Sequence, residues 1–183
     1  MEIKFAITEY IKNFIKHIGD NPDREGLIET PNRVVNSWAE LFNGYTTKVD
    51  IKQFEKENYK GLVILKNIDF YSTCEHHVLQ FSGICDIGYV PDEKLIGISK
   101  LAKIVDLYAN RLQIQERLTQ QILEHIVDLI QPKGVMVICT AQHNCITSRG
   151  VKKINARMVT SSIHGVFENK DLRDEFLQLV YKV

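Results

Sequence analysis

The sequence predicts an α+β protein with a helical N-terminal segment, residues 1–60, and a body of mixed strands and helices, residues 61–183. Three observations support this prediction. Apolar residues recur at helical spacing in the first part of the chain. Runs rich in β-branched and aromatic residues begin at residue 61, and two helical stretches separate one group of strands from the next. Elements that are grouped in this way are typical of α+β proteins.

Two amphipathic helices are expected in the N-terminal segment. Residues 3–18 place apolar side chains on one wide helical face, and the Gly- and Pro-containing stretch 19–26 ends this helix. In "ETPNRVV", Thr30 is the expected N-cap and Pro31 the first helical residue, where its missing N–H costs nothing. The buried stripe of this second helix is expected to contain Val34, Val35, Trp38, Leu41 and Phe42.

The body alternates between strand-like and helical stretches. Strands are expected over "GLVILKNIDFYSTCEHH", "FSGICDIGYVP" and "KLIGIS". Ser99 is the expected cap of a helix over "KLAKIVDLYANRL", and "IQERLTQQILEHIVDLI" is helical until Pro132 and Gly134. The segments "VMVICTAQHNC" and "GVKKINARMVTSSIHGVF" follow as strands, and "NKDLRDEFLQLVYKV" as a closing helix.

Composition narrows the class of protein. The 183 residues include 23 Lys plus Arg and 23 Asp plus Glu, so the formal net charge is zero. A neutral chain is a poor candidate for a general nucleic-acid or membrane-surface binder. The N-terminus is amphipathic and contains acidic residues, so it resembles neither a signal nor a transit peptide, and we expect a cytoplasmic protein whose four cysteines are thiols or metal ligands.

The stretch "STCEHH" contains two good metal ligands three residues apart, Cys74 and His77. Zinc accepts both thiolate and imidazole, and the later segment "AQHNCITSRG" supplies His143 and Cys145 as further candidates. A Cys/His/Cys set of three leaves the fourth tetrahedral position open, which is the pattern of a catalytic zinc. A zinc-stabilised binding module would instead close the site with a fourth ligand, His143 or Cys139.

The remaining cysteines and histidines have simpler explanations. Cys85 and Cys139 lie inside apolar, strand-like runs and are expected in the core. His76 and His143 can transfer protons near neutral pH, or can hold a metal ligand in place by a hydrogen bond. Glu75 is expected to have a structural role.

Five blocks together resemble the GTP cyclohydrolase I family over nearly the whole chain. They are "NPDREGLIETPNRV", "STCEHH", "IGISKLAKIVDLYANRLQIQERLTQQI", "HNCITSRGVKK" and "TSSIHGVF", in the family's order and spacing. In that family, water attacks C8 of the guanine ring of GTP, formate leaves, and rearrangement and ring closure give 7,8-dihydroneopterin triphosphate, at the start of folate and pterin synthesis. The resemblance implies Zn2+ bound by Cys74, His77 and Cys145, and acid–base roles for His76 and His143.

The resemblance also implies how GTP is bound. Glu116 matches the carboxylate that accepts hydrogen bonds from guanine, with Gln115 beside it. The candidates for binding the triphosphate are Ser99, Lys100, Lys103 and Arg149. Ser99 and Lys100 fall at a helix start, where free N–H groups attract phosphate. Family members often have Arg where this chain has Lys103, which keeps the charge but not the bidentate geometry.

The fold that the resemblance implies is the tunnelling fold (T-fold). An antiparallel sheet with helices packed on one side joins the sheets of neighbouring subunits into a barrel. Two pentameric rings then stack into a homodecamer, with the active sites between subunits. The alternative is another T-fold enzyme that acts on a pterin or a deazapurine, although the Cys/His/Cys set and the basic residues favour GTP.

Overall fold

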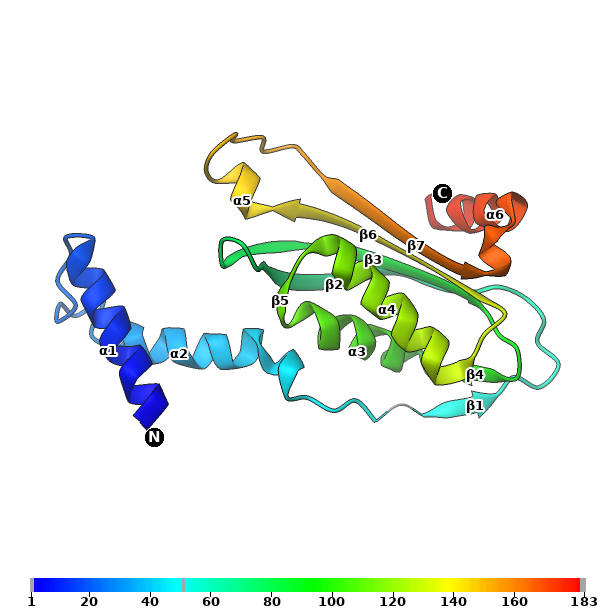
Figure 1. The fold of residues 1–183 in the computed structure, drawn as a ribbon, viewed down its shortest axis with the longest axis horizontal. Helices are drawn as coiled ribbons and strands as arrows, with labels where there is room; N and C mark the ends of the chain where they lie inside the picture. The colour runs from blue at the N-terminus through cyan, green and yellow to red at the C-terminus, as the bar shows by residue number, and fades with distance from the viewer. Residues whose placement is uncertain (1, 51, 182–183) are drawn as a thin grey trace. The chain divides into compact units, whose positions relative to one another are not determined.

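The computed structural model describes residues 2–50 and 52–181 (Figure 1). They fall into two compact units, within Met1–Asn43 and Gly44–Val183. The predicted functional division, residues 1–60 and 61–183, stays a prediction. Within the described ranges, no helix is both long and apolar enough to cross a membrane.

The first unit is a pair of helices, α1 (Glu2–His17) and α2 (Thr30–Leu41). Both lie where the sequence predicts them, but the expected cap of α2 was wrong. Glu29 occupies the N-cap position and Thr30 lies inside the helix. The reason is a preceding turn, in which the Thr30 N–H donates to the Leu27 carbonyl at 2.9 Å and leads directly into the helix.

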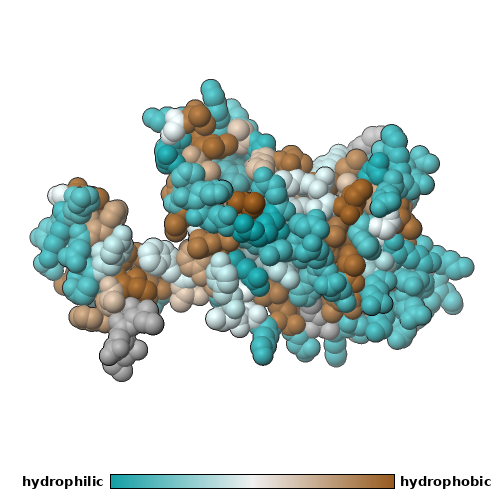
Figure 2. Space-filling model, in the orientation of Figure 1, coloured by the Kyte–Doolittle hydropathy of each residue, from teal (hydrophilic) through white to brown (hydrophobic). Residues whose placement is uncertain are grey.

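The apolar face of α1 is only partly covered within this unit. Ile11 and Ile15 are buried, whereas Tyr10, Phe14 and Ile18 remain 66%, 49% and 62% exposed. Figure 2 shows apolar surface on the first unit as well as on the second. The two helices therefore do not bury the whole of the wide face that the sequence predicts.

The second unit is built on a five-stranded sheet with the order β5-β2-β3-β6-β7. Its strands are β2 (Val63–Cys74), β3 (Leu79–Val90), β5 (Leu112–Gln113), β6 (Gly134–His143) and β7 (Met158–Gly165). All neighbours pair antiparallel except β2 and the short β5, which are parallel. A separate antiparallel pair joins β1 (Gln53–Glu55) to β4 (Lys94–Ile96).

Helices α3 (Ile98–Ala109) and α4 (Gln115–Ile130) cover one face of this sheet (Figure 1). Side chains along β6 alternate between the two faces of the sheet. Val135 and Val137 pack in the core beneath α3 and α4. Met136 and Ile138 point the other way, onto α6 (Lys170–Tyr181). The prediction of an α+β antiparallel sheet with helices on one side is confirmed for α3 and α4, and α6 adds cover to part of the opposite face.

Several short elements complete the unit, and the sequence patterns did not indicate them. They are η1 (Asn43–Tyr45), β1, β5, α5 (Asn144–Thr147) and η2 (Val166–Glu168). The predicted cap of α3 was also wrong, because Gly97 holds the cap position and Ser99 is the second helical residue. The backbone N–H of Lys100 already donates to the Gly97 carbonyl at 2.8 Å, so the helix begins two residues earlier than expected.

Close approach of β3 and β6 depends on a glycine. An added Cβ at Gly83 would lie 1.9 Å from the Thr140 carbonyl oxygen, which is backbone and cannot rotate away. We expect Gly83→Ala to lower the free energy of unfolding by about 3 kcal/mol, measured by urea denaturation. Ser82→Ala, one residue earlier, should change it by less than about 1 kcal/mol. Equal stability of the two variants would contradict this account of the strand pair.

Candidate metal centre and active site

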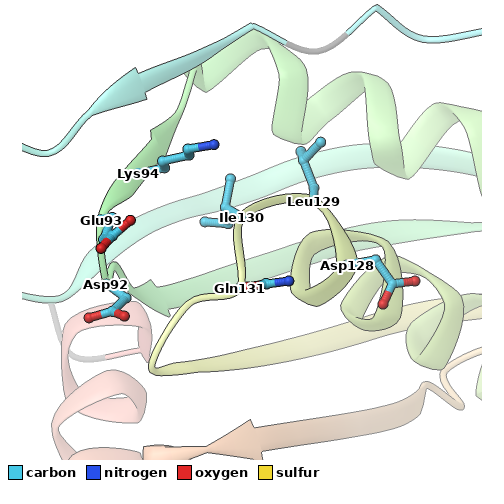
Figure 3. Close-up of a pocket in the computed structure, with 7 residues that line it drawn as sticks. All are labelled: Asp92, Glu93, Lys94, Asp128, Leu129, Ile130 and Gln131. Atoms are coloured by element: carbon cyan, nitrogen blue, oxygen red, sulfur yellow. The ribbon is translucent and has the colours of Figure 1, made fainter.

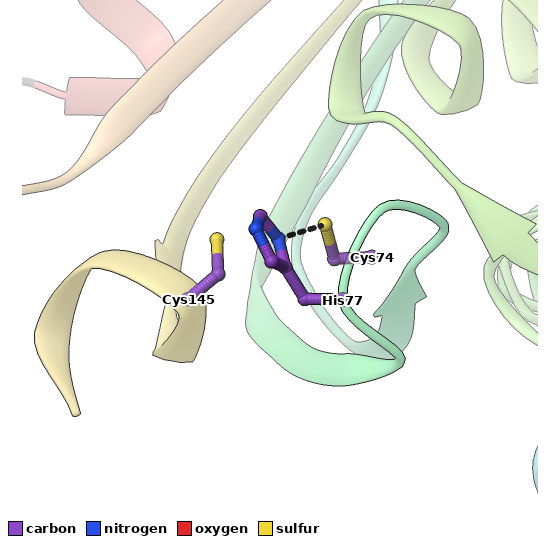
Figure 4. A group of neighbouring side chains, drawn as sticks. All are labelled: Cys74, His77 and Cys145. Atoms are coloured by element: carbon purple, nitrogen blue, oxygen red, sulfur yellow. Dashed lines mark hydrogen bonds between the residues drawn. The ribbon is translucent and has the colours of Figure 1, made fainter. Parts of the chain in front are cut away.

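Three predicted metal ligands converge at one end of the sheet. Cys74 ends β2, His77 lies in the following turn, and Cys145 lies in α5 just after β6. Strand β3 pairs with both β2 and β6, so the ends of these two strands lie at the same edge. One ligand atom from each residue lies within 4.8 Å of the other two (Figure 4). The cluster can therefore hold a metal ion.

The tight turn between β2 and β3 folds His77 back toward Cys74. The Val78 N–H donates to the Cys74 carbonyl at 2.9 Å, and Val78 has a positive φ of 52° that closes the turn. The Glu75 N–H donates to the Gln113 carbonyl of β5 at 3.0 Å, which ties the turn to the neighbouring strand. As a result, the Cys74 Sγ and His77 Nδ1 atoms lie 3.6 Å apart.

The chemistry of the three donors fits zinc. Two thiols and one imidazole are ligands that zinc prefers, and both cysteines are free. Cys74 is buried, Cys145 is half-buried and His77 is exposed, so one side of the cluster faces outward. Burial and the neighbouring Cys74 thiol raise the pKa of Cys145, whereas the charge of Arg149 lowers it. A bound cation would favour both thiolates.

The closed, four-ligand alternative finds no support among residues 2–50 and 52–181. Cys139 is fully buried within β6, where it pairs with Cys85 of β3. His143 directs its ring Nε2 at Gln115. The group of converging ligand atoms in the described ranges contains only the three residues above, which leaves a tetrahedral ion one open position. Cys85 and Cys139 are core residues, as predicted.

His143, at the end of β6, is held on two sides. Its ring stacks on Phe81, with centroids 4.4 Å apart and planes at 5°, because these residues are direct partners in the β3–β6 pair. Its Nε2 lies 2.8 Å from Gln115 Oε1. Burial lowers the pKa of His143, and the charge of Glu116 partly opposes this. The neutral imidazole is therefore favoured, which suits a proton acceptor.

His76 lies on the open side of the cluster. It is exposed, with its Nδ1 3.9 Å from Cys74 Sγ and its Nε2 3.9 Å from Glu75 Oε1. The two histidines thus differ in environment, because His143 is half-buried and fixed while His76 is solvated. Both lie next to metal-ligand candidates, as the sequence predicts.

An ion pair between the turn and α4 was not predicted. Arg117 donates from both terminal nitrogens to Glu75, at 2.6 and 3.1 Å, and so connects the turn that carries His77 to the first turn of α4. The same hydrogen bonds lower the pKa of Glu75. Glu75, for which a structural role is expected, therefore has Arg117 as its partner in the folded chain.

The candidate substrate residues divide into two groups. Gln115 and Glu116 begin α4 beside His143, and the charge of Arg149 acts on Cys145. Ser99 and Lys100 lie instead in the first turn of α3, and Lys103 lies one turn further along the same helix.

The start of α3 is far from the metal cluster within one chain. The other end of this helix lies near Cys74, because Ser72 Oγ donates to the Ala109 carbonyl at 2.7 Å. Twelve helical residues span about 18 Å. At its start, the Lys100 ammonium donates to the Asp50 carbonyl at 2.5 Å. One chain therefore holds Ser99 and Lys100 at the opposite end of α3 from the metal-ligand candidates.

A separate cavity of about 350 Å³ lies at the C-terminal end of α4 (Figure 3). It is lined by Asp92, Glu93, Lys94, Asp128, Leu129, Ile130 and Gln131. The Asp92 and Asp128 carboxylates do not point at a common centre. This cavity therefore lacks the convergent ligands that distinguish the metal cluster.

The fold and the cluster define a class of protein: an α+β protein whose sheet carries a possible metal site next to two histidines. The sequence model of the GTP cyclohydrolase I family matches residues 7–181. GTP cyclohydrolase 1 of Wolinella succinogenes is 47% identical over 178 residues, covering 95% of both chains. That of Helicobacter pylori (strain G27) is 45% identical over 180 residues, covering 95% of this chain and 99% of the relative. The chain belongs to the GTP cyclohydrolase I family, a family of hydrolases.

A solved structure supports the fold alone. The apo form of the archaeosine synthase QueF-Like is similar with a TM-score of 0.50 and 22% identity, over 59% of this chain and 97% of that one. The T-fold sheet is therefore shared with an otherwise distant protein. This likeness agrees with the predicted fold class.

The Glu75–Arg117 pair gives a test of how the turn is held. We expect Arg117→Ala to weaken zinc binding by about tenfold, because the turn loses its anchor on α4. Glu124→Ala, an exposed change on the same helix, should leave zinc affinity unchanged. Zinc affinity is measured by competition with a chromophoric chelator.

The charge-swapped double variant Glu75→Arg, Arg117→Glu should recover part of the lost zinc affinity. In the wild-type protein, Arg117 lowers the pKa of Glu75. The Glu75 carboxylate therefore stays charged and paired with Arg117 until the pH falls below that lowered pKa. Unchanged zinc affinity in Arg117→Ala would show that the anchor is dispensable.

Proposed function

We propose that this protein is a zinc-dependent GTP cyclohydrolase I that converts GTP and water to 7,8-dihydroneopterin triphosphate and formate. The observation that supports it most is the convergence of Cys74, His77 and Cys145 in a chain of this family. The relatives are named for this activity. We also propose that this reaction is the first step of folate and pterin synthesis.

Cys74, His77 and Cys145 would hold the ion. When bound, zinc supplies Lewis acidity, which strengthens water as a nucleophile near neutral pH. Guanine C8 is a weak electrophile, so the reaction needs this assistance. Cys74 and Cys145 have to stay reduced to bind the ion, which agrees with a cytoplasmic location.

The two histidines would move protons at different places. His143 is half-buried and its pKa is lowered, so it is neutral and able to accept a proton at neutral pH. His76 is exposed beside Cys74, where it can exchange protons with solvent. Ring opening and loss of formate both need such transfers.

GTP recognition would use charge at both ends of the substrate. The exposed Glu116 carboxylate can accept hydrogen bonds from guanine N1–H and the exocyclic amine. Its position next to Gln115, which contacts His143, would place the base near the metal cluster. Arg149 is close enough to influence Cys145 and could pair with phosphate oxygens.

The remaining phosphate-binding candidates support a site shared between copies of the chain. Ser99 and Lys100 lie at the far end of α3 from the metal cluster, and Lys103 lies one turn closer to it. A second copy could bring its α3 start to the first copy's cluster, whereas one chain cannot. We therefore propose a homo-oligomer, a decamer of two stacked pentamers, with each active site between subunits.

The activity is tested by incubating the purified protein with GTP and measuring formate together with the ultraviolet spectrum of a pterin. We expect both products with zinc present, and neither after removal of the metal with a chelator. Re-addition of zinc should restore them. Zinc-loaded wild-type protein that releases no formate would contradict the proposed function.

Two substitutions separate metal binding from proton transfer. Cys145→Ala should lose the bound zinc and at least about a hundredfold in activity, because two ligands hold zinc poorly. His143→Ala should keep its zinc and lose about a hundredfold or more in kcat. Metal content is measured by atomic absorption. Loss of zinc from His143→Ala would contradict this division of roles.

A mixing experiment tests the shared site. Cys145→Ala and the double variant Lys100→Ala, Lys103→Ala should each have little activity. Subunits dissociated and reassembled from an equal mixture should recover roughly a quarter of wild-type activity, because one site in four combines two intact halves. If every chain carried a complete site of its own, the mixture would stay as inactive as its components.

A further inference from the structure

The side-chain amide of Gln115 is already hydrogen-bonded within the protein, which leaves little capacity for a contact with substrate. It is the first residue of α4, yet its side chain is almost fully buried, with 1% of the residue exposed. Its amide Nε2 donates to the Cys139 carbonyl at 2.9 Å and the Met158 carbonyl at 3.0 Å, and lies 3.1 Å from Thr160 Oγ1. Both amide hydrogens are therefore used inside the protein.

These contacts fix which way the Gln115 amide points. A backbone carbonyl only accepts hydrogen bonds, so the amide nitrogen has to face Cys139 and Met158. The amide oxygen then has to face His143, whose Nε2 lies 2.8 Å away. Because that oxygen also only accepts, the hydrogen between them belongs to His143 Nε2.

The surroundings hold both side chains in place. Thr119 Oγ1 donates to the Gln115 carbonyl at 2.8 Å and lies 2.6 Å from Thr160 Oγ1, so α4 is joined to β7 at this point. On the other side, the His143 ring stacks on Phe81. The imidazole therefore has a fixed plane, and the amide decides its orientation within that plane.

We propose that Gln115 is a positioning residue that holds His143 as the Nε2–H tautomer, so that Nδ1 is the nitrogen with which His143 accepts a proton from substrate. The inference rests on the proposed function and replaces the expected direct contact of Gln115 with GTP. A neutral imidazole has one acceptor nitrogen, and the hydrogen bond to Gln115 determines which one it is. The neighbouring Glu116 remains the candidate for reading guanine.

The kinetic test is a double-mutant cycle with Gln115→Met, His143→Ala and the combined variant. Gln115→Met should lower kcat about tenfold to a hundredfold, with the KM for GTP and the zinc content unchanged. In the His143→Ala background, the same substitution should cost less than about twofold, because it acts through the missing ring. Gln120→Met, the same change on the exposed face of α4, should have no effect on kcat.

Other results of the cycle would overturn the proposal. A raised KM with unchanged kcat would indicate a direct contact with GTP. Losses that multiply in the double variant would indicate a general structural role for Gln115, as would loss of zinc from Gln115→Met. Wild-type protein without formate release would instead refute the proposed function, and the tautomer is then decided by the second measurement alone.

The second measurement needs no substitution at Gln115. The ring nitrogens of 15N-histidine-labelled, zinc-loaded wild-type protein are observed by NMR at about pH 8, where imidazole is neutral. The signals of His143 are assigned as those missing from His143→Ala. We expect a protonated Nε2 and an unprotonated Nδ1, and the opposite tautomer would refute the proposal even if Gln115→Met failed to fold.

Discussion

The arrangement of this protein depends on the antiparallel pairing of β3 with both of its neighbours. That pairing brings the end of β2 and the end of β6 to one edge of the sheet, although their last residues, Cys74 and His143, are 69 positions apart in the chain. Cys74 and Cys145 meet there, and the turn after Cys74 adds His77. The same register sets Phe81 opposite His143 and so stacks the two rings. The metal cluster and its neighbouring histidine thus follow from one hydrogen-bonded ladder.

The first turn of α4 contacts this edge of the sheet and holds two of its parts in place. Gln115 forms hydrogen bonds to β6, β7 and His143, while Arg117 forms an ion pair with Glu75 in the turn that carries His77. Both contacts come from the first turn of one helix, so a small shift of α4 would disturb the histidine and the turn together. Gly83 permits the close approach of β3 and β6 on which all of this rests.

The single chain places the candidate metal ligands, the two histidines and Glu116 at one edge of the sheet, whereas two of the candidate phosphate-binding residues, Ser99 and Lys100, lie at the far end of α3. A helix of 12 residues spans about 18 Å, so the start of α3 lies far from the cluster when the other end lies near Cys74. The proposal that active sites are shared between subunits therefore rests on the distance between the two ends of α3.

The sequence by itself determined the order and kind of the long elements, because hydrophobic periodicity reports directly on helices and strands. It also indicated Cys74, His77 and Cys145, since few residue types bind zinc. It failed at both predicted caps, where backbone turns rather than Thr30 or Ser99 satisfy the helix starts. Only the tertiary structure decided that Arg117 anchors Glu75 and that Gln115 faces His143, because these contacts join residues 28 to 42 positions apart and neither periodicity nor spacing records which distant side chains meet.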